Sequence, residues 1–242
     1  MNAGLRRVYS AVTLIPAAEC FPEIAAGFAL ALDDKPVRTP AKSPLVLPTE
    51  ALVAAIAAEW VAQGDRIRPY TMPMMSLACT AIDRAAPNRE RMVEDIVAYG
   101  GTDLVCYRAD GPADLVQRQI KVWQPLVDWV ALVHDAPLTV TAGIVPLGQP
   151  ATALRALTAA VAGFDDFGLA GLSLATSTAG SLVIALALAS GRLDGGAAFD
   201  AAQLDENYQI AKWGEDAEAA ERRREIRADL AAVERFWVLL RR

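Results

Sequence analysis

Hydrophobic residues are spaced differently in different parts of the chain, and the first part has the short apolar runs of β-strands. Residues 28–32 and 35–38 flank Asp33-Asp34, a pattern that predicts a β-hairpin, although its turn lacks the glycine that such turns prefer. Further short strands are expected within residues 8–15 and 45–47, where prolines punctuate the chain. The first part of the chain is therefore predicted to be β-rich.

One helix is expected inside this β-rich part. Thr49 is suited to cap its N-terminus, and the following apolar residues recur at four-residue steps, as on one face of a helix. This apolar stripe consists of Leu52, Ile56 and Trp60, and Gly64 then provides a stop signal. The methionines of Met72-Pro73-Met74-Met75 could line an adaptable groove, but filling gaps in a core is the favoured interpretation.

Beyond residue 73 the apolar residues recur at three- and four-residue steps, which is typical of amphipathic helices. Pro125 lies inside one such run and must kink it or start a second helix. The expected helices cover residues 74–84, 88–99, 113–134, 152–162, 169–190 with a break near Gly180, 197–212 and 215–240, with a short extended piece at 104–107. We therefore predict an α+β fold with a small β-rich N-terminal domain over residues 1–73 and a larger, mainly α-helical C-terminal domain over 74–242.

The most informative pattern lies in residues 204–214. At helical spacing, the apolar side comprises Leu204, Tyr208 and Ala211. Glu206, Gln209 and Trp213 share another side, which Gly214 closes as a helix-ending residue. A carboxylate, an amide and an indole on one face suit recognition of a polar surface beside an apolar one. The alternative is an ordinary amphipathic helix whose tryptophan enters the core, and spacing alone favours this alternative.

Composition and charge exclude several classes of function. The net charge of −6 argues against a nucleic-acid partner, because phosphate binding needs a basic surface. The arginines at 222–224 lie between Glu221 and Glu225 and are interpreted as a solvated helix face. Residues 167–191 contain no charged side chain, but only 181–189 are strongly apolar. This run is too short to cross a bilayer, so we expect a buried helix and no membrane insertion.

Cysteine and histidine usage bears on cofactors and on the compartment. Cys20, Cys79 and Cys106 are far apart, and His134 is the single histidine, so we expect reduced thiols and neither a metal nor another cofactor. Residues 1–10 lack the apolar run of a secretory signal, and no long transit peptide is evident. The expected location is the bacterial cytoplasm, or the mitochondrial matrix for a processed organellar chain.

The common catalytic signatures are missing from the sequence. Neither glycine pair, at 100–101 or at 195–196, is followed by the lysine of a phosphate-binding loop, and no nucleophile-elbow motif occurs. Paired carboxylates occur at 94–95, 165–166, 205–206 and 215–216. Adjacent residues on a helix point about 100° apart, so these pairs do not converge on one substrate atom. We therefore expect that the protein is not an enzyme.

Short motifs are spread in a fixed order over most of the chain. They are Thr39-Pro40 with Pro48-Thr49, Glu59-Trp60 with Gln63, Met72-Pro73, residues 80–83, 102–104 and 106–108, Gln119 with Trp123, Pro125 and Trp129, Ser181-Leu182, and Glu206, Gln209 and Trp213-Gly214. In order and spacing, this set resembles the assembly chaperones of the F-type ATP synthase that bind its free alpha subunit. One departure is Gln124, where that family commonly has aspartate.

The resemblance implies a two-part fold and a monomeric, ATP-independent holdase without cofactor. Such a protein would hold the new alpha subunit, preventing its aggregation until the beta subunit takes over the same surface. Carried over to this sequence, the resemblance assigns partner binding to Asp205, Glu206, Gln209 and Trp213. It assigns structural roles to Trp60, Gln63, Asp103, Arg108 and Trp123.

Two other functions remain open at this point. A small-molecule enzyme could use acid–base chemistry around Asp103, Arg108 and Glu206, which requires that these side chains converge in one deep pocket. A membrane-associated protein could instead use residues 167–191.

Overall fold

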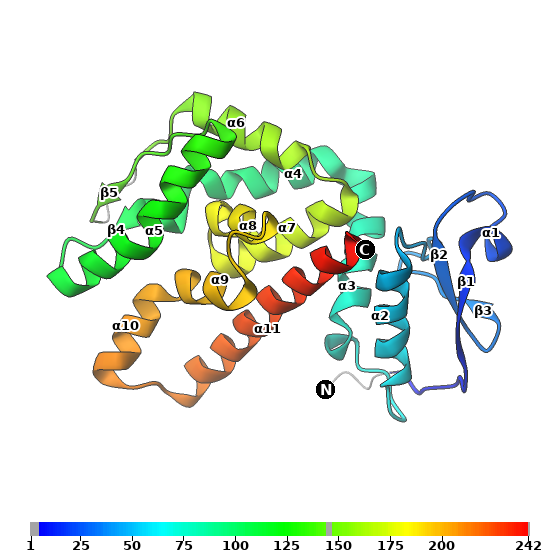
Figure 1. Cartoon of the computed structure of the whole chain (residues 1–242). Coiled ribbons are helices and arrows are strands. Elements are labelled where there is room, and N and C mark those ends of the chain that lie inside the picture. The colour runs from blue at the N-terminus through cyan, green and yellow to red at the C-terminus, as the bar shows by residue number, and fades with distance from the viewer. Residues whose placement is uncertain (1–4, 144–146, 242) are drawn as a thin grey trace. The chain divides into compact units, whose positions relative to one another are not determined.

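The computed structural model of the chain describes residues 5–143 and 147–241, and these residues form two compact units. The first unit contains the described residues within 1–89, 166–170 and 235–242, and the second contains those within 90–165 and 171–234. The division that we predict from sequence lies instead after residue 73. A small sheet near the N-terminus is followed by a series of helices, so the predicted α+β class is confirmed (Figure 1).

The first unit contains an antiparallel sheet in the order β1-β2-β3. Its strands are β1 (Val12–Pro16), β2 (Phe28–Leu32) and β3 (Lys35–Pro36), with the short helix α1 (Ala17–Cys20) between the first two. The predicted hairpin is confirmed, because Asp33 and Asp34 both adopt positive φ, 47° and 65°, as a tight hairpin turn requires. The Asp33 carboxylate fixes this turn by accepting hydrogen bonds from the amides of Ser10 and Ala11.

The predicted strand at residues 45–47 is wrong. This segment makes only isolated bridges, such as the one between Leu47 and Phe28. Val46 and its neighbours follow Pro44, which has no amide hydrogen to contribute to a ladder. The strand expected within residues 8–15 begins only at Val12.

Helix α2 (Glu50–Val61) begins as the sequence predicts. The Leu52 amide donates to Thr49 Oγ1 at 3.2 Å, and Leu52 and Ile56 are fully buried. The helix ends at Val61, before Gly64. Next come η1 (Pro69–Thr71), α3 (Pro73–Thr80), the π-helical turn η2 (Ala81–Ala85) and η3 (Ala86–Asn88). Met72 and Met74 are buried, which confirms that these methionines fill the core.

Most of the remaining elements belong to the second unit. They are α4 (Arg89–Ala98), η4 (Tyr99–Thr102), η5 (Leu104–Cys106), β4 (Tyr107–Arg108), α5 (Ala113–His134), β5 (Thr141–Ala142), α6 (Ala151–Ala162), α7 (Asp166–Ala179), α8 (Leu182–Ala189), α9 (Gly195–Ala202), α10 (Leu204–Trp213) and α11 (Ala217–Leu240). Strands β4 and β5 form a short parallel pair. Every residue of α8 is buried, which confirms the expected buried helix. No helix in the described ranges has the length and apolarity that a bilayer crossing demands.

The structure refines or corrects three of the sequence predictions about helices and confirms a fourth. Helix α5 continues past Pro125, so no second helix starts there. The segment predicted as one helix over 197–212 is two, because Gln203 leaves helical geometry with φ −106° and ψ 23°. Residues 104–106 form a turn of 3₁₀ helix where an extended piece was expected. The break near Gly180 is confirmed, since that glycine has a φ of 65°.

Candidate functional site

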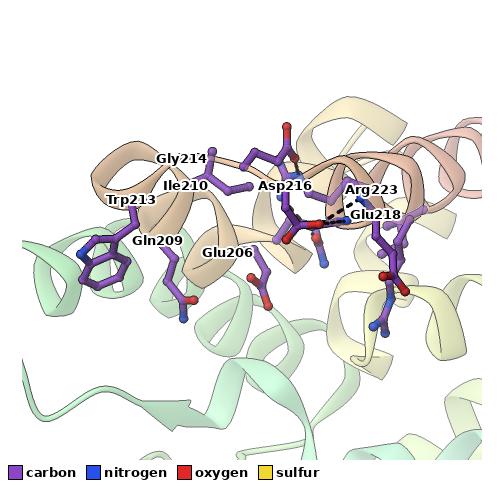
Figure 2. Close-up of a pocket in the computed structure, with 13 residues that line it drawn as sticks. Glu206, Gln209, Ile210, Trp213, Gly214, Asp216, Glu218 and Arg223 are labelled. Atoms are coloured by element: carbon purple, nitrogen blue, oxygen red, sulfur yellow. Dashed lines mark hydrogen bonds and ion pairs between the residues drawn. The ribbon is translucent and has the colours of Figure 1, made fainter.

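Helix α10 exposes one face and buries the other. Leu204 and Tyr208 are only 6% and 3% exposed, whereas Trp213 is 76% exposed. Glu206 and Gln209 are exposed on the same side as Trp213, as Figure 2 shows. The interpretation that Trp213 enters the core is therefore wrong. Helical spacing correctly groups Leu204 with Tyr208, and Glu206 with Gln209 and Trp213, whereas Ala211, which was expected on the apolar side, is exposed. Spacing does not reveal which face another element covers.

Side chains on the covered side of α10 bond to α5. The Gln119 side-chain amide donates to Asp205 Oδ1 at 2.8 Å, and the Tyr208 hydroxyl donates to Asp114 Oδ1 at 2.7 Å. Lys212 Nζ lies 3.6 Å from Asp114 Oδ2, in an ion pair with the same residue of α5. These contacts hold α10 along its length, so its exposed face is presented by a firmly attached helix.

Arg108 and Trp123 form a buried scaffold beneath α10. The Arg108 guanidinium donates from Nε to the Val105 carbonyl at 2.8 Å and from Nη1 to the Gln119 carbonyl at 3.0 Å. It lies 5.4 Å from the centre of the Trp123 ring, and the indole Nε1 of Trp123 donates to the Ala201 carbonyl at 2.8 Å. These bonds connect β4, α5 and the end of α9, which precedes α10 directly.

Asp103 is fully buried and connects η5 to the N-terminus of α8. Its carboxylate accepts hydrogen bonds from Ser181 Oγ at 2.5 Å, from the Val183 amide at 3.0 Å and from the Val105 amide at 3.2 Å. Burial raises the pKa of Asp103 to about 6, and these hydrogen bonds oppose that rise. Asp103 thus caps two elements: it accepts from Val105 in the first turn of η5, and from Val183 and the N-cap residue Ser181 at the start of α8.

Trp60 and Gln63 are placed within the first unit. The Tyr9 hydroxyl donates to the Trp60 carbonyl at 2.6 Å, and the two rings meet edge to face at 5.6 Å. Gln63 accepts from the Arg68 amide at 2.7 Å and donates to Thr71 Oγ1 at 3.1 Å. Both residues thus secure the end of α2 and the loop after it.

A groove of about 470 Å³ lies between α10 and α11. Glu206, Gln209, Ile210 and Trp213 line it from α10, and the residues of the connecting loop and the start of α11 complete it (Figure 2). Glu206 and Gln209 make no hydrogen bond or ion pair with any residue in the described part of the chain, and neither does the Trp213 indole nitrogen. The groove therefore presents polar groups that are free to bind another molecule.

Arg223 shapes this groove, and the sequence did not single it out. Its Nε lies 2.8 Å from Glu215 Oε1, and its Nη2 donates to Asn207 Oδ1 at 2.6 Å. Arg222 and Arg224 are exposed as predicted, but the Arg223 side chain is only 17% exposed. Its partners lie on the loop and on α10. Arg223 precedes Ile226 and Leu230 by three and seven residues, a spacing that places it on the covered side of α11 and separates it from the two neighbouring arginines.

The three residues that an acid–base enzyme would need do not converge. Asp103 and Arg108 are buried among their hydrogen-bond partners, whereas Glu206 lines the exposed groove. Among residues 5–143 and 147–241, no group of three or more histidine, cysteine, aspartate or glutamate side chains is arranged to hold a metal ion. The arrangement at α10 is suited to binding a surface.

Comparison with known proteins agrees with this geometry. A family model described as ATP12 chaperone protein matches residues 6–131, just over half of the chain. Two solved structures from Paracoccus denitrificans, Atp12 and a variant with one aspartate replaced by lysine, are each 40% identical to this chain, with a TM-score of 0.89. The match covers 97% of this chain, 98% of Atp12 and 97% of the variant. A candidate chaperone from Agrobacterium tumefaciens is 38% identical, with a TM-score of 0.89 over 97% of this chain and 86% of its own. The chain therefore belongs to the ATP12 chaperone family, the family of ATP synthase assembly chaperones that the resemblance in its sequence indicated.

Proposed function

We propose that this protein is an assembly chaperone that binds the unassembled alpha subunit of the F-type ATP synthase and prevents its aggregation until the beta subunit replaces it. It acts as a monomer in the bacterial cytoplasm, uses no ATP and catalyses no reaction. Membership of the ATP12 chaperone family supports assembly of the ATP synthase as the task. The alpha subunit as client follows from the resemblance of the sequence motifs.

The observation that carries the proposal is the unpaired face of α10. A free subunit exposes an apolar patch meant for its neighbour, and such patches promote aggregation. A holdase needs a surface that is apolar in part, carries an aromatic anchor and offers polar groups without internal partners. Glu206, Gln209 and Trp213 provide these features on one rigid helix. Release needs no fuel, because a beta subunit that binds more tightly displaces the chaperone.

The test is light scattering by purified alpha subunit that is diluted from denaturant with and without the chain. The wild-type chain should suppress scattering at near-equimolar ratio, and Glu206→Lys should suppress it less while its circular dichroism and urea midpoint stay unchanged. Glu225→Lys is the matched control, because Glu225 is an exposed residue of α11 outside the groove. If the wild-type chain leaves the aggregation of alpha unchanged, the proposal is refuted.

A further inference from the structure

We infer that the groove between α10 and α11 binds a segment of the client that carries a lysine or arginine side chain about 10 Å from an apolar one. This inference rests on the proposed function, because it concerns the same face of α10. It adds the chemistry by which the client is recognised: a cation near Glu206 and a flat or aliphatic side chain against Trp213.

The charges around the groove do not balance. Glu215 is neutralised by its ion pair with Arg223, at 2.8 Å. The Asp216 carboxylate is occupied at the start of α11, where it accepts hydrogen bonds from the amides of Glu218 and Ala219 at 3.0 and 2.9 Å. The carboxylates of Glu206 and Glu218 have no such partner in the described part of the chain.

Among the residues that the structure describes, Arg222 and Arg223 are the cationic side chains that line the groove. Four carboxylates therefore face two guanidinium groups, and the potential in the groove is negative. A cationic side chain would be attracted to it, whereas an acidic segment would be repelled. The overall charge of −6 strengthens the same preference for basic segments.

The geometry of α10 separates the two halves of the site. Glu206 and Trp213 are seven residues apart, so their positions differ by about 10 Å along the helix axis. Gln209 lies between them and can both donate and accept hydrogen bonds. The exposed indole of Trp213, with Ile210 and Ile226 in the groove, offers the apolar half.

This separation selects among client segments. A segment that is only apolar would cover Trp213 but leave the Glu206 carboxylate desolvated and unpaired, which costs binding energy. A segment with a cation about 10 Å from an apolar side chain satisfies both halves, and a helix with two such residues seven positions apart meets this spacing. The matching client segment is therefore basic and amphipathic.

The first experiment locates the client segment. A photo-crosslinking amino acid replaces Gln209, and the variant is irradiated with purified alpha subunit, after which the crosslinked peptide is identified by mass spectrometry. We expect a peptide of alpha with a lysine or arginine close to an apolar residue. A crosslinked peptide without any cationic side chain would overturn the inference.

The second experiment measures affinity for soluble alpha subunit. Glu206→Gln keeps the shape of the side chain and removes its charge, and should weaken binding about tenfold at low salt, with a smaller dependence on ionic strength than the wild type. Trp213→Ala should weaken binding by at least about tenfold. The matched controls are Glu225→Gln and Tyr70→Ala, which change an exposed carboxylate and an exposed aromatic ring away from the groove and should bind like the wild type.

Charge reversal separates recognition from a general loss of structure. Glu206→Lys should bind poorly to alpha, and replacing the crosslinked cationic residue of alpha by glutamate should restore binding. Suppose that the wild-type chain protects alpha from aggregation and that Glu206→Gln binds alpha as tightly as the wild type does. In that case the inference fails while the proposed function stands. If the wild-type chain does not bind alpha at all, both fail.

Discussion

Arg223→Met tests whether one buried arginine holds the binding groove in shape. The substitution keeps an unbranched side chain of similar length, so the apolar stem can still pack near Phe199. It removes the ion pair with Glu215 and the hydrogen bonds to Asn207 and Gln203, at 2.8, 2.6 and 3.3 Å. The guanidinium also lies 5.1 Å from the centre of the Phe199 ring, a contact that the thioether replaces only in part.

The loss of stability expected for Arg223→Met lies between the free energies measured for breaking exposed and buried ion pairs. The side chains of Arg223 and Glu215 are 17% and 33% exposed, so their pair exceeds the ~0.5 kcal/mol typical of surface pairs but falls short of the ~3 kcal/mol lost when a buried pair is broken. The hydrogen bonds from the charged donor to two amide side chains add about 1 kcal/mol. We expect the free energy of unfolding to fall by about 2 kcal/mol.

Urea denaturation followed by circular dichroism measures this loss, and hydrogen exchange of residues 203–216 shows whether the loop and α10 open more often. Arg224→Met is the control, because Arg224 pairs with Glu221 of its own helix and both side chains are largely exposed. It should change stability by less than about 0.5 kcal/mol. If the two variants are equally stable, or if exchange in 203–216 is unchanged in Arg223→Met, the reasoning is refuted.

Three further changes test the scaffold beneath the groove. Burial raises the pKa of Asp103 from 3.8 to about 6, so the folded state binds the proton of this carboxyl group more tightly than the unfolded state does. The contribution of the protonated carboxyl group to the free energy of unfolding is therefore complete below about pH 4 and is lost as the pH rises through 6. The free energy of unfolding of the wild type relative to Asp103→Asn should therefore decline by about 2 kcal/mol from pH 4 to pH 7 in urea titrations, and a constant difference would contradict this. Gln124→Asp should have a free energy of unfolding about 0.5 kcal/mol below that of its control Gln124→Asn, because the new carboxylate would lie one turn from that of Asp128, which now accepts a hydrogen bond from Gln124 Nε2 at 2.8 Å. Its side chain is also too short to keep the 3.5 Å contact between Gln124 and Arg108, and equal urea midpoints for the two variants would argue against the effect. Trp123→Phe should lower the free energy of unfolding by about 2 kcal/mol, since it leaves the buried Ala201 carbonyl without its donor at 2.8 Å, and a loss below about 0.5 kcal/mol would show that this bond matters little.

The sequence by itself determined the features that depend on a few neighbouring residues. Thr49 caps α2, Gly180 separates α7 from α8, and Gly214 ends α10, because capping and positive φ are properties of short segments. The Asp33-Asp34 turn belongs to the same class, since both residues tolerate the left-handed conformation. The family, too, is evident from the order of the motifs along the chain.

Only the tertiary structure decided which of these features face the solvent. Periodicity placed Glu206, Gln209 and Trp213 on one side of a helix, but burial depends on whether a distant element covers that side. Helix α5 covers the other side, through Gln119 and Asp114, so the indole of Trp213 stays exposed. In the same way, helical spacing places Arg223 on the covered side of α11, but its part in the groove comes from partners on other elements, Glu215 and Asn207. Local spacing determines how side chains are grouped, and packing between distant segments determines which group is left free to bind.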